Sequence, residues 1–124
     1  MKVKQIGVFI ENRSGRLREV LEVLDDNKIN IRALSLADTS DYGILRLIVD
    51  RFDDAVRELK KANFTLSETD VIAVNVSSRP GVLEILHDED LNVEYMYSFV
   101  GKFSDNVDMI LRIENIEEAS KLLC

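Results

Sequence analysis

Residues 6–15 read Ile6-Gly7-Val8-Phe9-Ile10-Glu11-Asn12-Arg13-Ser14-Gly15, and the same pattern returns as Ile72-Ala73-Val74-Asn75-Val76-Ser77-Ser78-Arg79-Pro80-Gly81. Further along, Val20–Leu24 returns as Val82–Leu86, and Asp53-Asp54-Ala55 returns as Glu117-Glu118-Ala119. A repeat of this length indicates two copies of one structural unit. A domain of about 60 residues buries only about 60% of its unfolded surface, so we expect the copies to pack together. The seam between them is then the expected place for a ligand.

The first copy alternates apolar and polar residues over 6–10 and then changes to helical spacing from Leu17 to Asp26. A second strand is expected over 30–38, with Arg32, Leu34 and Leu36 on one face, and a third over 44–49. A helix starting near Asp53-Asp54 and a strand over 64–69 complete the order β-α-β-β-α-β. The sequence therefore predicts an α+β module of the ferredoxin-like type, an antiparallel sheet with its helices on one face.

The second copy follows the same course, with strands expected over 71–76, 92–100 and 107–113 and helices over 82–86 and 116–123. Its first helix lacks the counterpart of Arg16–Glu19, about one helical turn. The sequence given reaches Cys124 without a fourth strand for this copy. We therefore predict two ferredoxin-like modules, 1–70 and 71–124, the second of them truncated.

The net charge of −7 argues against a surface that contacts nucleic-acid phosphates. No apolar run approaches the roughly 18 residues that span a bilayer, so no membrane partner is expected. A single cysteine, Cys124, fits a reducing cytoplasm. One histidine and one cysteine supply no catalytic set and no metal centre, so the sequence predicts neither an enzyme nor a cofactor.

Three stretches of the chain resemble the ACT domain family: Glu11–Leu17, Asn30–Ser35 and Ser78-Arg79-Pro80-Gly81. The resemblance covers essentially the whole chain, and it is strongest to stand-alone tandem ACT proteins. It implies a regulatory module, not a catalyst, that binds a free amino acid near the first strand–helix loop at a module interface. Ser14 stands where such loops usually carry proline, which the second copy keeps at Pro80.

The first strand–helix loop has the chemistry that an amino-acid zwitterion needs. Gly15 permits a positive φ, and the N–H groups that follow at a helix start suit a carboxylate. Asn12 offers an amide and Glu11 an acceptor for the ammonium, whereas the simpler interpretation is that Asn12 and Ser14 only cap the helix. The first loop is expected to dominate binding. The candidate ligand-binding residues are Glu11, Asn12, Arg13, Ser14, Gly15, Arg16, Leu17, Asp38, Thr39, Ser78, Arg79, Pro80 and Gly81.

The sequence also leads to expectations about the oligomeric state, the partners and an alternative function of the protein. If the strand over 71–76 lacks a neighbour, its uncharged edge favours a symmetric homodimer; alternatively, the segment over 64–76 bends and serves both sheets. The expected partners are a free amino acid, a second copy and an unidentified regulated enzyme. The alternative function is a structural module that pairs with a protein and binds no small ligand.

Overall fold

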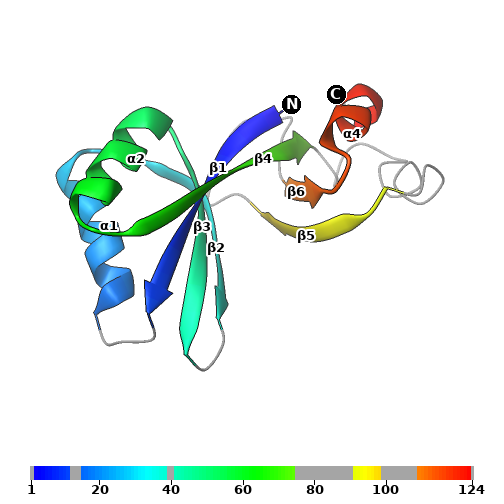
Figure 1. Cartoon of the computed structure of the whole chain (residues 1–124). Coiled ribbons are helices and arrows are strands. Elements are labelled where there is room, and N and C mark those ends of the chain that lie inside the picture. The colour runs from blue at the N-terminus through cyan, green and yellow to red at the C-terminus, as the bar shows by residue number, and fades with distance from the viewer. Residues whose placement is uncertain (1, 12–14, 39–40, 75–90, 99–108, 124) are drawn as a thin grey trace. The chain divides into compact units, whose positions relative to one another are not determined.

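The computed structural model describes residues 2–11, 15–38, 41–74, 91–98 and 109–123 (Figure 1). The chain divides into two compact units. One, the N-terminal unit, comprises Lys4–Thr69, and the other, the C-terminal unit, comprises Met1–Val3 with Asp70–Cys124. Each unit is described by itself.

The N-terminal unit has the predicted β-α-β-β-α-β order. Its strands follow the sheet order β2-β3-β1-β4, and β3 is antiparallel to both of its neighbours. This is the strand order expected when each helix crosses over one intervening strand. The elements are β1 (Lys2–Glu11), α1 (Arg16–Asp26), β2 (Ile31–Asp38), β3 (Tyr42–Val49), α2 (Phe52–Lys61) and β4 (Thr65–Val74).

Alternation along the strands builds the core of the N-terminal unit. Ile6 and Val8 of β1 lie opposite Leu47 and Leu45 of β3, and all four side chains are buried against the helices. The helices contribute residues at helical spacing, among them Val20, Leu24, Ala55 and Leu59. Each fully buried valine, leucine or isoleucine side chain contributes roughly 1.5–3 kcal/mol to the stability of the fold. Figure 1 shows both helices on the same side of this sheet.

Both helices end in the same hydrogen-bonded turn. After α1, Lys28 has a φ of 56° and the Ile29 N–H donates to the Leu24 carbonyl at 2.9 Å. After α2, Asn63 has a φ of 68° and Phe64 donates to Leu59 at 3.1 Å. These are Schellman endings built without glycine. In each, the apolar residue that follows, Ile29 or Phe64, is buried in the core.

Helix α2 begins at Phe52, next to the predicted start at Asp53-Asp54, and its N-cap Arg51 makes no side-chain capping hydrogen bond. Both acids lie in the first turn, where they suit the positive end of the helix dipole. Asp54 also forms ion pairs with Arg51 at 3.5 Å and Arg57 at 2.8 Å.

The C-terminal unit repeats the strand arrangement of the first. Its strands follow the order β4-β6-β5, with β6 (Met109–Ile113) antiparallel to β4 and to β5 (Val93–Ser98). Helix α4 (Ile116–Leu123) buries Ala119 and Leu123 on strand residues that include Ile72, Leu111 and Ile113. The helix predicted over 82–86 lies outside the described residues. No helix in the described part of the chain is long and apolar enough to cross a membrane.

The strands predicted over 64–69 and 71–76 are in fact one strand. β4 runs without a break from Thr65 to Val74, because Glu68-Thr69-Asp70 contains no glycine or proline and continues the extended backbone. Its neighbours in the sheet order are β1 and β6. The interpretation of 71–76 as an unpaired edge is therefore wrong, and the alternative of one strand that takes part in both units is correct.

The fold is thus an α+β pair of ferredoxin-like modules. The first and third strands of each module are neighbours, and so are the second and third. In both modules the second strand also begins with the same irregularity, a register shift between Ile31 and Ala33 in one and between Val93 and Tyr95 in the other. The repeat in the sequence is therefore a repeat in backbone geometry.

Candidate functional site

The ends of β1 and β2 lie at the same edge of the N-terminal sheet. Gly43 of β3 lies opposite Ile10 of β1 on one side and opposite Asp38 of β2 on the other. Glu11 and Asp38 therefore end two strands that run in the same direction, separated by β3 and so by about 10 Å. Helix α1 begins only a few residues after Glu11, so its N-terminus belongs to the same edge. A ligand there meets two strand ends and one helix start.

Gly15 shapes the start of α1. It is the N-cap residue, with φ 87° and ψ −7°, and as a glycine it has no side chain to cap the helix. Its carbonyl accepts the first helical hydrogen bond, from the Glu19 N–H at 3.0 Å. The N–H groups of the first turn have no partner within a helix, and among the described residues no side-chain cap takes one of them. The left-handed backbone expected at Gly15 is thus present, at a helix start suited to an anion.

Arg16 points inward at this helix start. Its side chain is only 13% exposed, and the guanidinium carbon lies 4.2 Å from the centre of the Phe64 ring. It forms an ion pair with Glu19, and its buried Nε has no hydrogen-bond partner among the described residues. A cation over an aromatic face is worth about 0.5–2 kcal/mol, more where water is excluded. Arg16 is therefore held at the start of α1 by Phe64 and by Glu19, whose carboxylate offsets its charge.

The structure thus brings five of the predicted ligand residues to one edge: Glu11, Gly15, Arg16, Leu17 and Asp38. Glu11 is exposed, and Leu17 is partly exposed at the second position of α1. The other predicted ligand residues lie outside the described residues, namely Asn12, Arg13, Ser14, Thr39, Ser78, Arg79, Pro80 and Gly81. Sequence analysis missed Phe64, which follows α2 and whose contact with Arg16 depends on folding.

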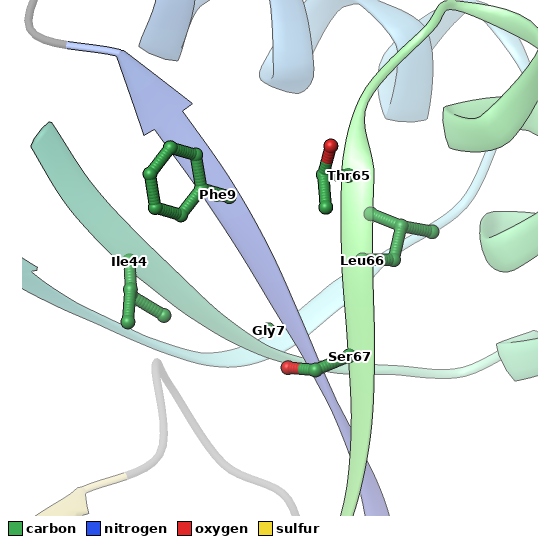
Figure 2. A pocket seen from close by; sticks show the side chains of 6 residues that line it. All are labelled: Gly7, Phe9, Ile44, Thr65, Leu66 and Ser67. Atoms are coloured by element: carbon green, nitrogen blue, oxygen red, sulfur yellow. The ribbon is translucent and has the colours of Figure 1, made fainter.

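A small pocket lies on the same unit, between β1, β3 and β4. Its volume is about 140 Å³, and its lining residues are Gly7, Phe9, Ile44, Thr65, Leu66 and Ser67 (Figure 2). Figure 2 shows the Ser67 side chain directed toward Gly7. Gly7 makes room for this hydroxyl, because a Cβ at position 7 would lie 2.5 Å from Ser67 Oγ. Phe9 also stacks on Tyr42, with ring centres 4.8 Å apart.

The pocket lining does not suit a zwitterion. It holds two hydroxyl groups and no charged side chain, and burying an unpaired ion costs several kcal/mol. An apolar group of about the size of benzene fits a cavity of about 150 Å³. The edge at Glu11 and Gly15, with a carboxylate and a helix start, has more of the polar groups that an amino acid needs. Among the described residues, no cluster of acidic, histidine and cysteine side chains is able to hold a metal ion.

The βαββαβ order of the N-terminal unit and the repeat of its strand arrangement in the C-terminal unit define a pair of related ferredoxin-like modules. A family model described as an ACT domain pair matches residues 1–124, the whole chain. A crystal structure of a protein from Bacteroides thetaiotaomicron is 40% identical over 98% of this chain and 86% of that one, with a TM-score of 0.86. The chain belongs to the family of ACT domain pairs.

More distant solved structures share the fold. The regulatory subunit of aspartate kinase from Thermus thermophilus, in a ligand-free form, is 15% identical over 95% of this chain and 88% of that chain, with a TM-score of 0.63. The corresponding subunit from Thermus flavus is 16% identical over 98% and 92%, with a TM-score of 0.61. No functionally curated protein shows a significant match.

Proposed function

We propose that this ACT domain pair is a regulatory protein that binds a free amino acid where β1 and β2 end. The observation that carries the proposal is the left-handed N-cap Gly15, which has no side chain of its own to cap the first turn of α1. That turn binds the ligand carboxylate through backbone N–H groups, assisted by the positive end of the helix dipole.

The ammonium of the ligand binds Glu11. Glu11 and Asp38 end strands about 10 Å apart, so one amino-acid backbone does not span both positions and the helix start together. Glu11 immediately precedes the loop to α1, whereas Asp38 precedes the β2–β3 turn. Asn12, Arg13 and Ser14 complete this first site, Leu17 contacts the ligand side chain, and Asp38 with Thr39 closes over it.

The second strand–helix loop, with Ser78, Arg79, Pro80 and Gly81, binds more weakly. Its helix is shorter by about a turn in the sequence, so its dipole and its anchoring area are smaller. Asn12→Ala is therefore expected to weaken binding more than Ser78→Ala.

The output is regulatory and not catalytic. Two similar solved structures are regulatory subunits of aspartate kinase, which supports a role in which ligand binding alters an enzyme. We propose that this chain likewise acts on an enzyme in the cytoplasm, as a homodimer. We identify this enzyme only as the one whose activity the chain regulates.

A thermal-shift screen over the twenty amino acids tests the ligand class, followed by calorimetry on any that raise the melting temperature. Glu11→Gln is expected to weaken binding at least tenfold, because it removes the charge that pairs with the ammonium. Glu68→Gln is the matched control, since Glu68 is also an exposed strand glutamate of the N-terminal unit. If no amino acid raises the melting temperature and calorimetry detects no heat of binding, the protein is instead the structural pairing module.

A further inference from the structure

The pocket beside Gly7 lies on the face of the N-terminal sheet opposite the helices. Side chains alternate along a strand, so positions 7 and 9 of β1 face away from the helices against which Ile6 and Val8 are buried. Ile44 of β3 lies opposite Phe9 in the register and therefore shares this face. All the lining residues belong to the N-terminal unit.

Gly7 forms the floor of this pocket because it has no side chain. β1 lies between β3 and β4 in the sheet order, so Ile44 borders the pocket on one side and Ser67 on the other (Figure 2). A Cβ at position 7 would enter this space and approach Ser67 Oγ to 2.5 Å. The pocket therefore depends on glycine at position 7.

One wall of the pocket is an aromatic ring that is already held in place. Phe9 stacks on Tyr42, with ring centres 4.8 Å apart and planes inclined by 22°. Both side chains remain accessible, with 42% of Phe9 and 41% of Tyr42 exposed. Aromatic rings attract one another in offset or edge-to-face arrangements, and a ring fixed in advance loses little freedom when a ligand binds it.

The opposite wall carries two hydroxyl groups and no charge. Thr65 and Ser67 lie two residues apart on β4, so both hydroxyls belong to the same face of the sheet. A hydroxyl both donates and accepts hydrogen bonds. Arg46 lies opposite Gly7 in the register, but it does not line the pocket. An ion in the pocket would thus lose its hydration without gaining a charged neighbour in the lining.

We propose that this pocket binds a small uncharged aromatic molecule with one hydrogen-bonding group, of which phenol is the simplest example. The pocket volume of about 140 Å³ is close to that of a cavity of about 150 Å³ that accepts benzene. The ring lies over Gly7 and contacts Phe9, and its hydroxyl forms a hydrogen bond with Ser67. This site is separate from the proposed amino-acid site, because it lies in the middle of β1 and Glu11 ends that strand.

Amide chemical shifts of the full chain, followed by NMR, test the site with phenol as the probe. Phenol is uncharged at pH 7, since a phenolic hydroxyl has a pKa of about 10. We expect a dissociation constant of about 1 mM, typical of so small a ligand, and shifts centred on Gly7 and Ser67. Cyclohexanol, which has the hydroxyl without the aromatic ring, and benzoate, which is charged, are expected to bind at least about fivefold more weakly. No shifts at about 10 mM phenol, or tighter binding of either comparison compound, overturns the proposal.

Two substitutions test the floor and the polar wall separately. Gly7→Ala places a methyl group in the pocket, so it is expected to weaken the binding of phenol and of toluene at least about fivefold. Ser67→Ala removes the hydrogen bond to the phenol hydroxyl, so it is expected to lower the ratio of phenol affinity to toluene affinity about fivefold. Circular dichroism confirms that both variants fold.

Ser35→Ala is the matched control for the polar wall. Ser35 lies opposite Arg46 of β3, on the same face of the sheet as Gly7, but it does not line the pocket. Its replacement is expected to leave both affinities unchanged. If Gly7→Ala binds phenol like the wild type, or if Ser67→Ala and Ser35→Ala have the same ratio of phenol to toluene affinity, phenol does not occupy the pocket in the proposed way.

Discussion

The side-chain amide of Asn30 donates a hydrogen bond to Asp50 Oδ2 at 3.1 Å, and it thereby ties the start of β2 to the end of β3. The C-terminal unit has the same relationship, in which Asn92 donates to Glu114 Oε2 at 3.2 Å. The backbone repeats as well, because the N–H of each acid donates to the carbonyl of its asparagine, at 3.2 Å and 3.1 Å. The two modules are thus related at the level of single hydrogen bonds.

Asp50 is expected to matter more than Asn30. Its Oδ1 also accepts the Asn30 backbone N–H at 3.0 Å, so Asp50→Ala removes two hydrogen bonds and Asn30→Ala removes one. With about 0.5–1.5 kcal/mol for each bond, we expect losses of about 1–3 kcal/mol for Asp50→Ala and about 0.5–1.5 kcal/mol for Asn30→Ala in the free energy of unfolding. Urea denaturation followed by circular dichroism measures both. Equal losses for the two variants would show that the backbone contact contributes nothing.

The alternation of apolar residues was sufficient to predict most of the architecture. Ile6 and Val8 share a face because strand side chains alternate, and Val20 and Leu24 share one because they lie a helical turn apart. The strands predicted over 64–69 and 71–76 are one strand, because the polarity of Glu68-Thr69-Asp70 alone does not end a strand. The endings at Lys28 and Asn63 were not predicted, since the usual signal there is glycine.

The candidate site was predictable only where its chemistry is local. The positive φ of Gly15 follows from its place between a strand and a helix, and the structure has it. The contact of Arg16 with Phe64 joins residues that are distant in the sequence, and the pocket beside Gly7 needs three strands. Such features depend on tertiary packing, which no single stretch of sequence specifies.

Gly15 is expected to be required for its backbone conformation and not for lack of space. A Cβ built at this position meets no atom of the described structure within 4 Å, yet φ is 87°. A left-handed conformation costs an L-residue roughly 1–2 kcal/mol, less for asparagine and more for a β-branched residue. Stability should therefore fall in the order glycine, asparagine, alanine, valine, as measured by thermal unfolding. If Gly15→Asn were less stable than Gly15→Val, this explanation would be wrong.

Gly7 and Ser67 are expected to be coupled. A Cβ at position 7 meets the Ser67 hydroxyl at 2.5 Å and its next neighbour, a methyl of Ile44, only at 3.7 Å. Once Ser67→Ala has removed the hydroxyl, Gly7→Ala should stabilise the protein by about 0.5–1 kcal/mol, because alanine loses less backbone entropy in a strand. In the wild-type background the same change should gain less, since the hydroxyl has to rotate away. A double-mutant cycle by urea denaturation measures the coupling, and additive effects would contradict it.

Lys2 and Glu117 give the C-terminal unit a pH-dependent contact. The Lys2 Nζ donates to Glu117 Oε1 at 2.8 Å. This hydrogen bond, with the attraction between the charges, raises the pKa of Lys2 above its usual 10.5 and lowers the pKa of Glu117 below its usual 4.5. The depressed carboxyl pKa gives stability that is present above pH 4.5 and is lost as the pH falls through the folded value. The raised lysine pKa gives stability that is present below pH 10.5 and is lost as the pH rises through its folded value.

Glu117→Gln is therefore expected to lower the melting temperature slightly between these limits and to match the wild type outside them. Both side chains are exposed, so the difference should also shrink in about 1 M salt, where charges are screened within about 3 Å. Melting curves of the two proteins across pH 3–11, at low and high salt, measure the effect. Glu118→Gln is the control on the same helical turn, because Glu118 contacts Asn115 instead of a lysine. A wild-type advantage that persists below the folded pKa of Glu117 would show that the residue stabilises α4 by something other than its charge on Lys2.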